Sequence, residues 1–335
     1  MATIQDVARL AGVSTATVSR VLNDNYKVSD KRRQLVLDAV KTLGYRPNIV
    51  GRNLSRSENR TILVVSSWID DDMIRGASFA AKEIGYDLIL SYTTVEDDKD
   101  ALKYFENGLA GGILFINFRG TDTRIEELCS NYPVVQCAEY VDFPEACFVS
   151  IRDDNAIEEL TEMLVKQGRK RFAFIAPGSR PESTIHYAEA RESGFRRALE
   201  KTGTHINEDF VVRYPTPGSS LEAAEKAAKA WLDLPESERP DAIVCASDTI
   251  ALACMNTLIR GGVRVPQDVS ITGFDNRRAV YANPKLTTVA QPFFEMGAES
   301  VRMLANMMSG KDVAEKRIFL DHRIVVRGST DETLE

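Results

Sequence analysis

The sequence predicts an α/β protein, with an all-α helix-turn-helix head followed by a two-lobed core of doubly wound parallel sheets. Apolar side chains recur at helical spacing in residues 3–44, and capping residues precede the runs. Residues 1–60 hold 11 Lys and Arg against 5 Asp and Glu, a net charge of +6, although the whole chain has a net charge of −7. From Thr61 onward, short β-rich runs alternate with helical stretches, and both faces of these runs are apolar, as in parallel strands covered by helices.

The first predicted helix of the head begins after Thr3. The Thr3 hydroxyl and the Asp6 carboxylate together indicate an N-cap with an acidic first turn. Gly12 can take the positive φ that lets this helix end in a sharp turn. The expected buried face repeats at helical spacing and consists of Ile4, Val7, Ala8 and Ala11.

The second and third predicted helices complete a helix-turn-helix. Ser14 is the expected N-cap of the second helix, whose exposed face carries small residues and Arg20, which is long enough to contact a guanine edge. Ser29 is the expected N-cap of the third helix, and Gly44 ends it. The expected buried side chains are Val18, Val21 and Leu22 in the second helix and Val36, Ala39, Val40 and Leu43 in the third. Any three-helix bundle would show this spacing, but a basic head on a remainder of net charge −13 favours a DNA-binding module.

Three stretches resemble the headpiece of the LacI/GalR family of bacterial transcription repressors. They are "TIQDVARLAGVSTATVSRVLN", "VSDKRR" and "LGYRPNIVGRNL". The resemblance runs through all three helices and into the linker without a gap. It implies DNA-binding roles for Thr3, Ser14, Thr15, Ala16, Thr17, Ser19, Arg20, Asn23, Ser29, Tyr45, Asn48 and Leu54.

A linker at 48–60 follows the headpiece of residues 1–47. Its segment 49–56 has the length of a short helix that is unstable alone, and Gly51 weakens such a helix by about 1 kcal/mol. The resemblance implies a hinge helix that orders when two protomers meet over the operator, with Leu54 inserted into the minor groove. The alternative is that Leu54 is an ordinary apolar residue of the linker.

The core, residues 61–335, is expected to form two similar lobes because its strand–helix order restarts near residue 163. Ligands of such folds bind at the C-terminal edges of parallel strands, which predicts a cleft between the lobes. The resemblance extends over this region and implies a periplasmic-binding-protein-like fold with three crossing segments. It implies lobe one at about 61–161 and 291–320, and lobe two at about 162–290 and 321–330. Strands are expected at 61–66, 86–91, 112–116, 133–137, 147–151, 171–176, 241–246, 269–273 and 323–327, and helices at 72–84, 153–167, 187–202, 220–234, 248–261 and 293–309.

Two charged residues match ligand-binding positions of the family. Arg191 matches an arginine that binds ligand hydroxyls or carboxylates, although an arginine on an amphipathic helix is more often solvated. Asp275 directly follows a strand and matches an aspartate that accepts ligand hydrogen bonds; the alternative is a turn aspartate that caps a helix. Asp248 is expected to be an N-cap. The weaker candidates for effector binding are Ser247, Trp68, Asp153 and Gln291.

Carboxylate, guanidinium and amide groups on opposite walls suit a polyhydroxylated ligand, because each hydroxyl both donates and accepts hydrogen bonds. Trp68 offers an aromatic face for a sugar ring or a nucleobase, unless it belongs to the core. The loop at 66–72 is shorter than the usual loop of the family, so effector contacts from that loop do not carry over. We expect a sugar or sugar derivative as effector, with nucleosides and purines as the alternative.

Other classes of site and location are disfavoured. The five cysteines are widely spaced in apolar surroundings, which indicates reduced core residues, and the three histidines have no metal-ligand spacing to Cys or Glu. No cofactor or metal is expected. No apolar core follows the first Met, and no run is long enough to span a membrane, so we expect a cytoplasmic, nucleoid-associated protein. Nucleophile-elbow, zincin, P-loop and dinucleotide-binding motifs are absent from the sequence, which argues against an enzyme.

We predict a homodimeric transcriptional regulator that binds a palindromic DNA operator under effector control, and the family resemblance implies a repressor. A solute-binding protein with the same core fold is the rival class, disfavoured by the basic head. A further alternative concerns 292–304, which loosely resembles the helix of catabolite control proteins that binds a phosphorylated carrier protein. Arg302 there could pair with a phosphate, whereas a helix using Met296, Val301, Met303 and Leu304 in the dimer is the favoured interpretation.

Overall fold

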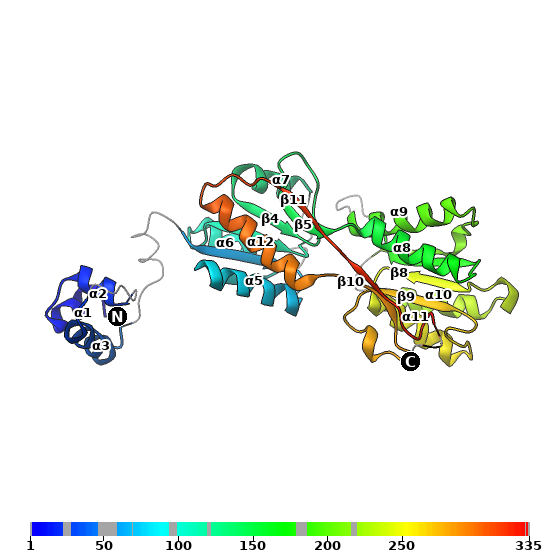
Figure 1. Cartoon of the computed structure of the whole chain (residues 1–335), viewed down its shortest axis with the longest axis horizontal. Helices are drawn as coiled ribbons and strands as arrows, with labels where there is room; N and C mark the ends of the chain where they lie inside the picture. Colours follow the sequence, from blue (N-terminus) through cyan, green and yellow to red (C-terminus); the bar gives the residue numbers. More distant parts are fainter. Residues whose placement is uncertain are drawn as a thin grey trace. The chain divides into compact units, whose positions relative to one another are not determined.

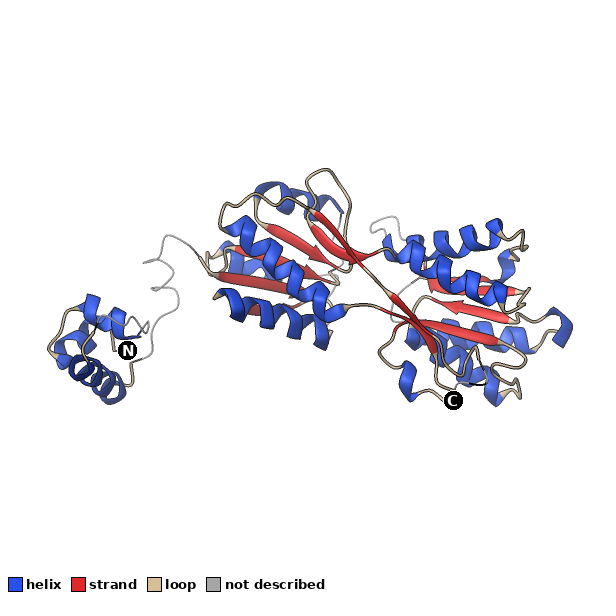
Figure 2. Cartoon of the chain, viewed as in Figure 1, coloured by secondary structure: helices blue, strands red, loops and turns tan. Residues whose placement is uncertain are grey.

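The headpiece and the core form separate compact units, Met1–Arg60 and Thr61–Glu335, in the computed structural model. Each unit has its own apolar core. The described part of the headpiece contains helices alone, whereas the core contains helices and strands (Figure 2). The structure describes residues 2–22, 28–45, 59–68, 70–93, 99–118, 122–178, 186–215, 220–331 and 333.

The headpiece consists of helices whose apolar faces meet in one small core. Its described helices are α1 (Ile4–Ala11), α2 (Thr15–Leu22) and α3 (Asp30–Leu43) (Figure 1). Most of the expected inward-facing side chains are fully buried, while Ile4, Leu22, Val40 and Leu43 are partly buried at the edge of the core. The buried members are Val7, Ala8, Ala11, Val18, Val21, Val36 and Ala39.

The helix caps of the headpiece follow the expectation with one exception. Thr3 and Asp6 form a reciprocal capping box, in which the Thr3 backbone N–H donates to Asp6 Oδ2 at 3.0 Å. The Ser14 Oγ accepts from the Thr17 N–H at 3.2 Å, and Gly12 has a φ of 63° at the end of α1. Ser29 is the N-cap residue of α3, as predicted, and lies in extended backbone, but its side chain makes no capping hydrogen bond. Of the predicted DNA-binding residues, Asn23, Asn48 and Leu54 lie outside the described residues, as does most of the predicted hinge.

Lobe one of the core is built on a parallel sheet with helices on both faces. The described strand order is β11-β5-β4-β3-β1-β2, and the paired strands are all parallel. Side chains of α5 and α12 pack on one face of this sheet, and side chains of α6 and α7 pack on the other. The elements are β1 (Thr61–Ser66), α5 (Asp71–Ile84), β2 (Asp87–Tyr92), α6 (Lys99–Glu106), β3 (Gly112–Ile116), α7 (Asp122–Asn131), β4 (Val134–Cys137), β5 (Phe148–Ile151), α12 (Phe293–Met308) and β11 (Arg317–Leu320).

Lobe two repeats this architecture. Its described strand order is β12-β10-β9-β8-β6-β7, with β12 antiparallel to β10 and the other pairs parallel. Helix α8 packs on α9 and α10 packs on α11, and Figure 1 shows these two pairs on opposite faces of the sheet. The elements are α8 (Asp153–Lys166), β6 (Phe172–Pro177), α9 (His186–Lys201), η1 (Glu208–Phe210), β7 (Val211–Tyr214), α10 (Ser220–Leu232), η3 (Glu236–Glu238), β8 (Ala242–Cys245), α11 (Asp248–Arg260), β9 (Ser270–Asp275), η4 (Ala279–Tyr281), β10 (Thr287–Ala290) and β12 (Arg323–Val325).

The described chain passes between the lobes after β5, after β10 and after β11. Helix α8 contacts α9, β10 and β12, so it belongs to lobe two. The first crossing therefore precedes Asp153, and the expected end of lobe one near residue 161 is wrong. A sequence boundary drawn inside a continuous helix cannot be a crossing, because the helix packs as one rigid piece.

Strands β7, β10 and β11 were not predicted from the sequence. Strand β10 reads Thr-Thr-Val-Ala, and its threonines are buried, so the run lacks the apolar texture that marked the other central strands. Strands β7 and β11 are short and lie at sheet edges, where polar side chains are tolerated. Helices α6 and α7 lie between predicted strands, where helices were expected but no bounds were given for these two.

Helices α5 and α12 approach each other closely through two glycines. A Cβ atom on Gly76 would lie 1.9 Å from the Phe294 carbonyl oxygen, and one on Gly297 would lie 2.1 Å from the Met73 carbonyl oxygen. The two helix backbones are therefore in contact, which fixes the start of α5 relative to the start of α12. On α12, Met296, Val301, Met303 and Leu304 are buried in the core of lobe one, so the interpretation of this face as a dimer surface is wrong.

The cysteines are structural residues of the core. The five cysteines are free, and burial raises the pKa of the Cys137 and Cys254 thiols to about 12. Across the described ranges, His, Cys, Asp and Glu form no group of three or more that could hold a metal ion. Among the helices that the structure describes, none has the length and apolar character needed to cross a membrane.

Candidate functional sites on the headpiece and between the lobes

One face of α2 presents the predicted DNA-reading side chains. Thr15, Ala16 and Arg20 are exposed, while Val18 and Val21 on the opposite face are buried in the headpiece core. Small exposed side chains at the start of a helix allow its backbone to approach the floor of a major groove. Of the other predicted contacts, Thr3, Ser14 and Ser29 are exposed, and Thr17, Ser19 and Tyr45 are half-buried.

A cavity of about 440 Å³ lies between the two lobes of the core. Lobe one contributes the end of β1 and the start of α12, and lobe two contributes α9, the start of α11 and the end of β9. These are the C-terminal edges of the parallel strands, where the fold was expected to place a ligand. All six predicted effector residues line this one cavity: Arg191, Asp275, Ser247, Trp68, Asp153 and Gln291.

Arg191 is buried, with only 6% of its surface exposed, so it is not a solvated residue of an amphipathic helix. Its Nε and Nη2 atoms each lie 2.7 Å from Asp153 Oδ1, and its Nη1 donates to the Ala246 carbonyl at 2.6 Å. The guanidinium carbon lies 3.5 Å from the centre of the Phe274 ring and 4.6 Å from that of Tyr187. Burial raises the pKa of Asp153, and the Arg191 charge opposes that shift. Arg191 and Asp153 therefore form a fixed ion pair in the cavity wall.

Asp275 ends β9 with a φ of 103°, an uncommon backbone conformation for an aspartate, and it lies half-buried at the cavity. The Gln291 Nε2 donates to Asp275 Oδ1 at 2.7 Å. Burial raises the pKa of Asp275 to about 7, although Arg191 acts in the opposite direction. The carboxyl group can thus both donate and accept when protonated, and it can only accept when ionised.

Ser247 takes the N-cap role that was expected of Asp248 at the start of α11. The Ser247 Oγ accepts from the Ile250 N–H at 3.4 Å, so Ser247 is the N-cap and also lines the cavity. Asp248 is buried and accepts from the backbone N–H groups of Arg277 and Arg278 at 2.7 and 3.1 Å. Asp248 therefore holds the loop after β9, and its predicted role as N-cap is wrong.

Aromatic side chains cover part of the cavity wall. Trp68, two residues after β1, has 56% of its surface exposed and is not a core residue. Tyr187 and Phe293 also line the cavity, and sequence reasoning did not single them out. Tyr187 is four residues before Arg191 on the same helix, a spacing that places both on one face and could have marked it.

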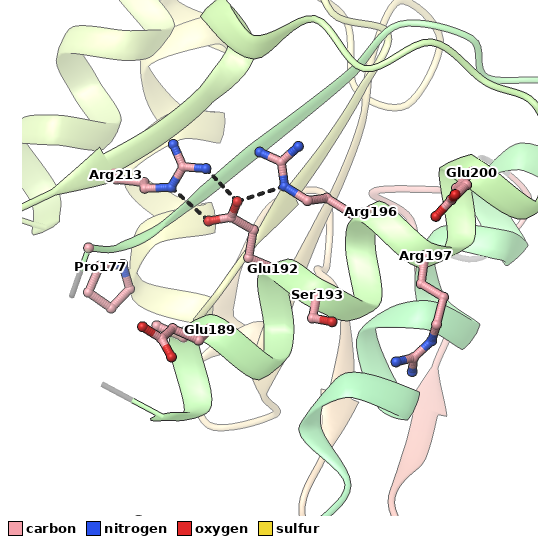
Figure 3. Close-up of a pocket in the computed structure, with 10 residues that line it drawn as sticks. Pro177, Glu189, Glu192, Ser193, Arg196, Arg197, Glu200 and Arg213 are labelled. Carbon is pink, nitrogen blue, oxygen red and sulfur yellow. Dashed lines mark hydrogen bonds and ion pairs between the residues drawn. The ribbon is translucent and has the colours of Figure 1, made fainter. Parts of the chain in front are cut away.

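A second depression, of about 650 Å³, lies on the outer face of α9 beside β7 (Figure 3). Here Glu192 accepts hydrogen bonds from Arg196 and Arg213 (Figure 3). Arg196 also pairs with Glu208. The lining side chains include none of the predicted effector residues. Paired surface charges of this kind contribute little stability and offer no convergent set of unpaired groups to a ligand.

Comparison with known proteins assigns the chain to a family. Residues 3–48 match the family described as bacterial regulatory proteins, lacI family, and residues 161–330 match a periplasmic binding protein-like domain. The chain is 35% identical to the HTH-type transcriptional repressor CytR of Escherichia coli (strain K12) over 337 residues, which covers 98% of this chain and 96% of CytR. The chain belongs to the LacI family. This LacI-family protein is also 34% identical to catabolite control protein A of Priestia megaterium over 339 residues, covering 98% and 99% of the two chains.

Solved structures of transcriptional regulators resemble this chain over almost its whole length. The Lac repressor dimer bound to operator and the anti-inducer ONPF has a TM-score of 0.81 and 26% identity, covering 98% of this chain and 99% of that one. A transcriptional regulator CelR–cellobiose complex has a TM-score of 0.70 and 28% identity, covering 98% and 100%. The protein is therefore a LacI-family DNA-binding transcriptional regulator with a periplasmic-binding-protein-like core. Of the two classes considered, the chain is therefore a transcriptional regulator and not a solute-binding protein with the same core fold.

Proposed function

We propose that this regulator represses transcription as a homodimer on a palindromic operator, in the cytoplasm at the nucleoid, and that an uncharged sugar or sugar derivative in the interlobe cavity controls it. The single observation that carries the effector part is that both lobes line one cavity with polar groups and aromatic faces. A ligand there contacts both lobes at once, so it has a different affinity for different lobe arrangements.

The charges of the cavity support an uncharged ligand. Arg191 is already paired with Asp153 and with the Ala246 carbonyl, so its donors are largely engaged. Asp275 and Glu139 also line the cavity, so that with Asp153 its three acidic side chains outnumber its two arginines, Arg191 and Arg278. A carboxylate or phosphate on the ligand would therefore meet a wall that is acidic on balance. Hydroxyl groups suit Asp275 and Gln291 because they donate as well as accept.

Nucleosides and purines are the alternative effector class. The exposed face of Trp68, with Tyr187 and Phe293 on the same cavity wall, can stack on a nucleobase as well as on a sugar ring. The similarity to catabolite control protein A keeps a phosphorylated carrier protein as a further alternative partner. Against that, Arg302 is already paired with Glu299 and Glu83 on the surface of lobe one.

Thermal-shift measurements on the full chain test the effector class. The probes are D-glucose, D-ribose, cellobiose, adenosine, guanine and D-gluconate, because a ligand that binds only the folded protein raises its Tm. We expect a rise with an uncharged sugar or its derivative and none with D-gluconate, and Asp275→Ala should abolish the rise. A rise with D-gluconate alone would contradict the argument from cavity charge, and a rise with adenosine or guanine alone would select the alternative class.

Exposed apolar side chains support a homodimer. Leu90 and Tyr92 are exposed on β2, which is the edge strand of the lobe-one sheet in the described strand order. Leu221, Ile259 and Tyr281 are exposed on lobe two, with Tyr281 at 85%. Such side chains on an edge strand and on helices mark surfaces that another chain can cover.

Sedimentation velocity with selection of bound DNA tests the dimer and the operator together. We expect a dimer that enriches palindromic duplexes, with an affinity that falls steeply as salt rises. Tyr92→Asp combined with Tyr281→Asp should give a folded monomer with much weaker operator binding. A wild-type monomer that binds all duplexes equally would overturn the proposal.

A further inference from the structure

One side chain of lobe two contacts two carboxylates of lobe one. Arg277, in the loop after β9, pairs through Nη2 with Asp70 and through Nη1 with Asp72 Oδ2 at 2.6 Å. Its guanidinium carbon also lies 4.4 Å from the centre of the Phe293 ring at the start of α12. The contact is partly desolvated, since Asp70 is 4% exposed and the Arg277 side chain 26%. Charges removed from water in this way interact more strongly than pairs on the open surface.

Each partner is anchored within its own lobe. Asp70 is the N-cap of α5, because its Oδ1 accepts from the Met73 N–H at 3.0 Å. The Arg277 backbone N–H donates to the buried Asp248 at 2.7 Å. If the lobes move apart, Asp70 cannot stay with Arg277 without disturbing the start of α5, and Arg277 cannot stay with Asp70 without disturbing its buried hydrogen bond to Asp248. A change in lobe arrangement therefore has to separate the charges.

The segments that make this contact also line the interlobe cavity. Trp68 lines the cavity and Asp70 follows two residues later, and Asp275 lines the cavity two residues before Arg277. Phe293 lines the cavity and lies against the Arg277 guanidinium. A molecule that fills the cavity therefore touches the segments that position both ends of the ion pair.

We propose that Arg277, Asp70 and Asp72 form an interlobe latch that holds the two lobes in the arrangement seen in this structure. The latch sets the equilibrium between this arrangement and a more open one in the absence of any ligand. Because the same segments carry the latch and line the cavity, the latch also sets how strongly a ligand in the cavity shifts that equilibrium. This consequence rests on the proposed function. The acidic partners stand at the start of α5, Asp70 as its N-cap and Asp72 in its first turn.

Distance measurements between the lobes by pulsed electron spin resonance test the latch. The spin labels are attached after Glu126→Cys in lobe one and Glu238→Cys in lobe two, both exposed positions, with Cys129→Ser to remove the half-buried native thiol. The full chain is diluted with unlabelled chain, so that distances within one chain dominate. The sample holds neither DNA nor a ligand, so its outcome does not depend on the proposed effector or operator.

Charge reversal should open the latch. Arg277→Glu places a carboxylate against Asp70 and Asp72, and we expect a second, distinct distance population to become the major one. Arg277→Glu combined with Asp72→Arg restores one attractive pair and should return part of the original population. Arg264→Glu is the matched control, because Arg264 pairs with Asp268 of the same lobe. It should leave the distances unchanged.

Two further measurements keep the test decisive. Circular dichroism of each variant shows whether both lobes are folded, and Asp72→Asn serves as a milder second variant if Arg277→Glu is not folded. We expect Asp72→Asn to increase the second population by a smaller amount. A distance distribution identical to wild type in folded Arg277→Glu, or in Asp72→Asn if the former does not fold, would overturn the latch. If adding Asp72→Arg to Arg277→Glu leaves the distance distribution unchanged, the pairing of Arg277 with Asp72 is wrong.

Discussion

The headpiece and the cavity place their candidate functional side chains in opposite environments. On α2 the predicted DNA contacts Thr15, Ala16 and Arg20 are exposed, and stability comes from a separate set of buried side chains. In the cavity, Arg191 and Asp153 are buried and paired, so the same atoms shape the site and hold the lobe together. The difference implies that recognition and stability can be separated by mutation in the headpiece but not in the cavity wall.

The largest effect is expected from Arg191→Ala. Removing the guanidinium leaves the buried Asp153 carboxylate without its charge partner, which costs on the order of 3–5 kcal/mol in the free energy of unfolding. Urea denaturation of the full chain, followed by a signal from the core, measures the loss. Arg264→Ala serves as a control for an exposed arginine. Unchanged stability in Arg191→Ala would break the contrast between the two regions.

Arg20→Ala should weaken operator binding without changing stability. Loss of a side chain that contacts a base edge costs about 1–3 kcal/mol in binding and relaxes the preference for that base. Gel-shift titration against a selected operator measures the affinity, and thermal melting checks the headpiece. Unchanged affinity and base preference would mean that α2 does not read the operator.

Asp275→Asn should change the pH dependence of stability. The folded state raises the pKa of Asp275 to about 7, so it binds a proton that the unfolded chain releases near its ordinary value of about 4. The contribution of Asp275 to stability therefore falls as pH rises from about 4 and becomes constant above about 7. The Tm of Asp275→Asn relative to wild type should rise over the same range, as a thermal melting series measures. A Tm difference between Asp275→Asn and wild type that does not depend on pH would contradict the raised pKa of Asp275.

The smallest effect is expected from Arg264→Gln. This arginine pairs with Asp268 four residues along the chain on an exposed surface, where ion pairs contribute little to stability. Urea denaturation should give a free energy of unfolding within experimental error of wild type. A larger loss in the free energy of unfolding would show that surface ion pairs of lobe two contribute stability that we attribute to its buried ion pairs.

The headpiece could be predicted closely because its determinants are local. The Thr3–Asp6 capping box, the left-handed Gly12 and the apolar spacing of each helix all lie within a few residues of one another in sequence. The Ser29 cap was the exception, because whether a serine side chain turns toward its helix depends on surroundings that the pattern does not contain.

In the core, the sequence predicted the alternating strands and helices and six residues that line the cavity. It missed Tyr187 and Phe293, whose aromatic character fits a buried core as well as a cavity wall. It misassigned Asp248, because an acidic residue at the start of a helix resembles a cap whatever it contacts. The crossing before α8 also depended on which lobe that helix packs against.

The sequence by itself therefore determined the helix-turn-helix, the charge division between head and core, and the α/β order, since periodicity, capping and charge are properties of neighbouring residues. Only the tertiary structure decided that Arg191 is buried against Asp153, that Asp248 holds the loop after β9, and that Arg277 pairs with Asp70 and Asp72. These contacts join residues far apart in the chain, and their formation depends on the packing of whole sheets and helices rather than on local sequence.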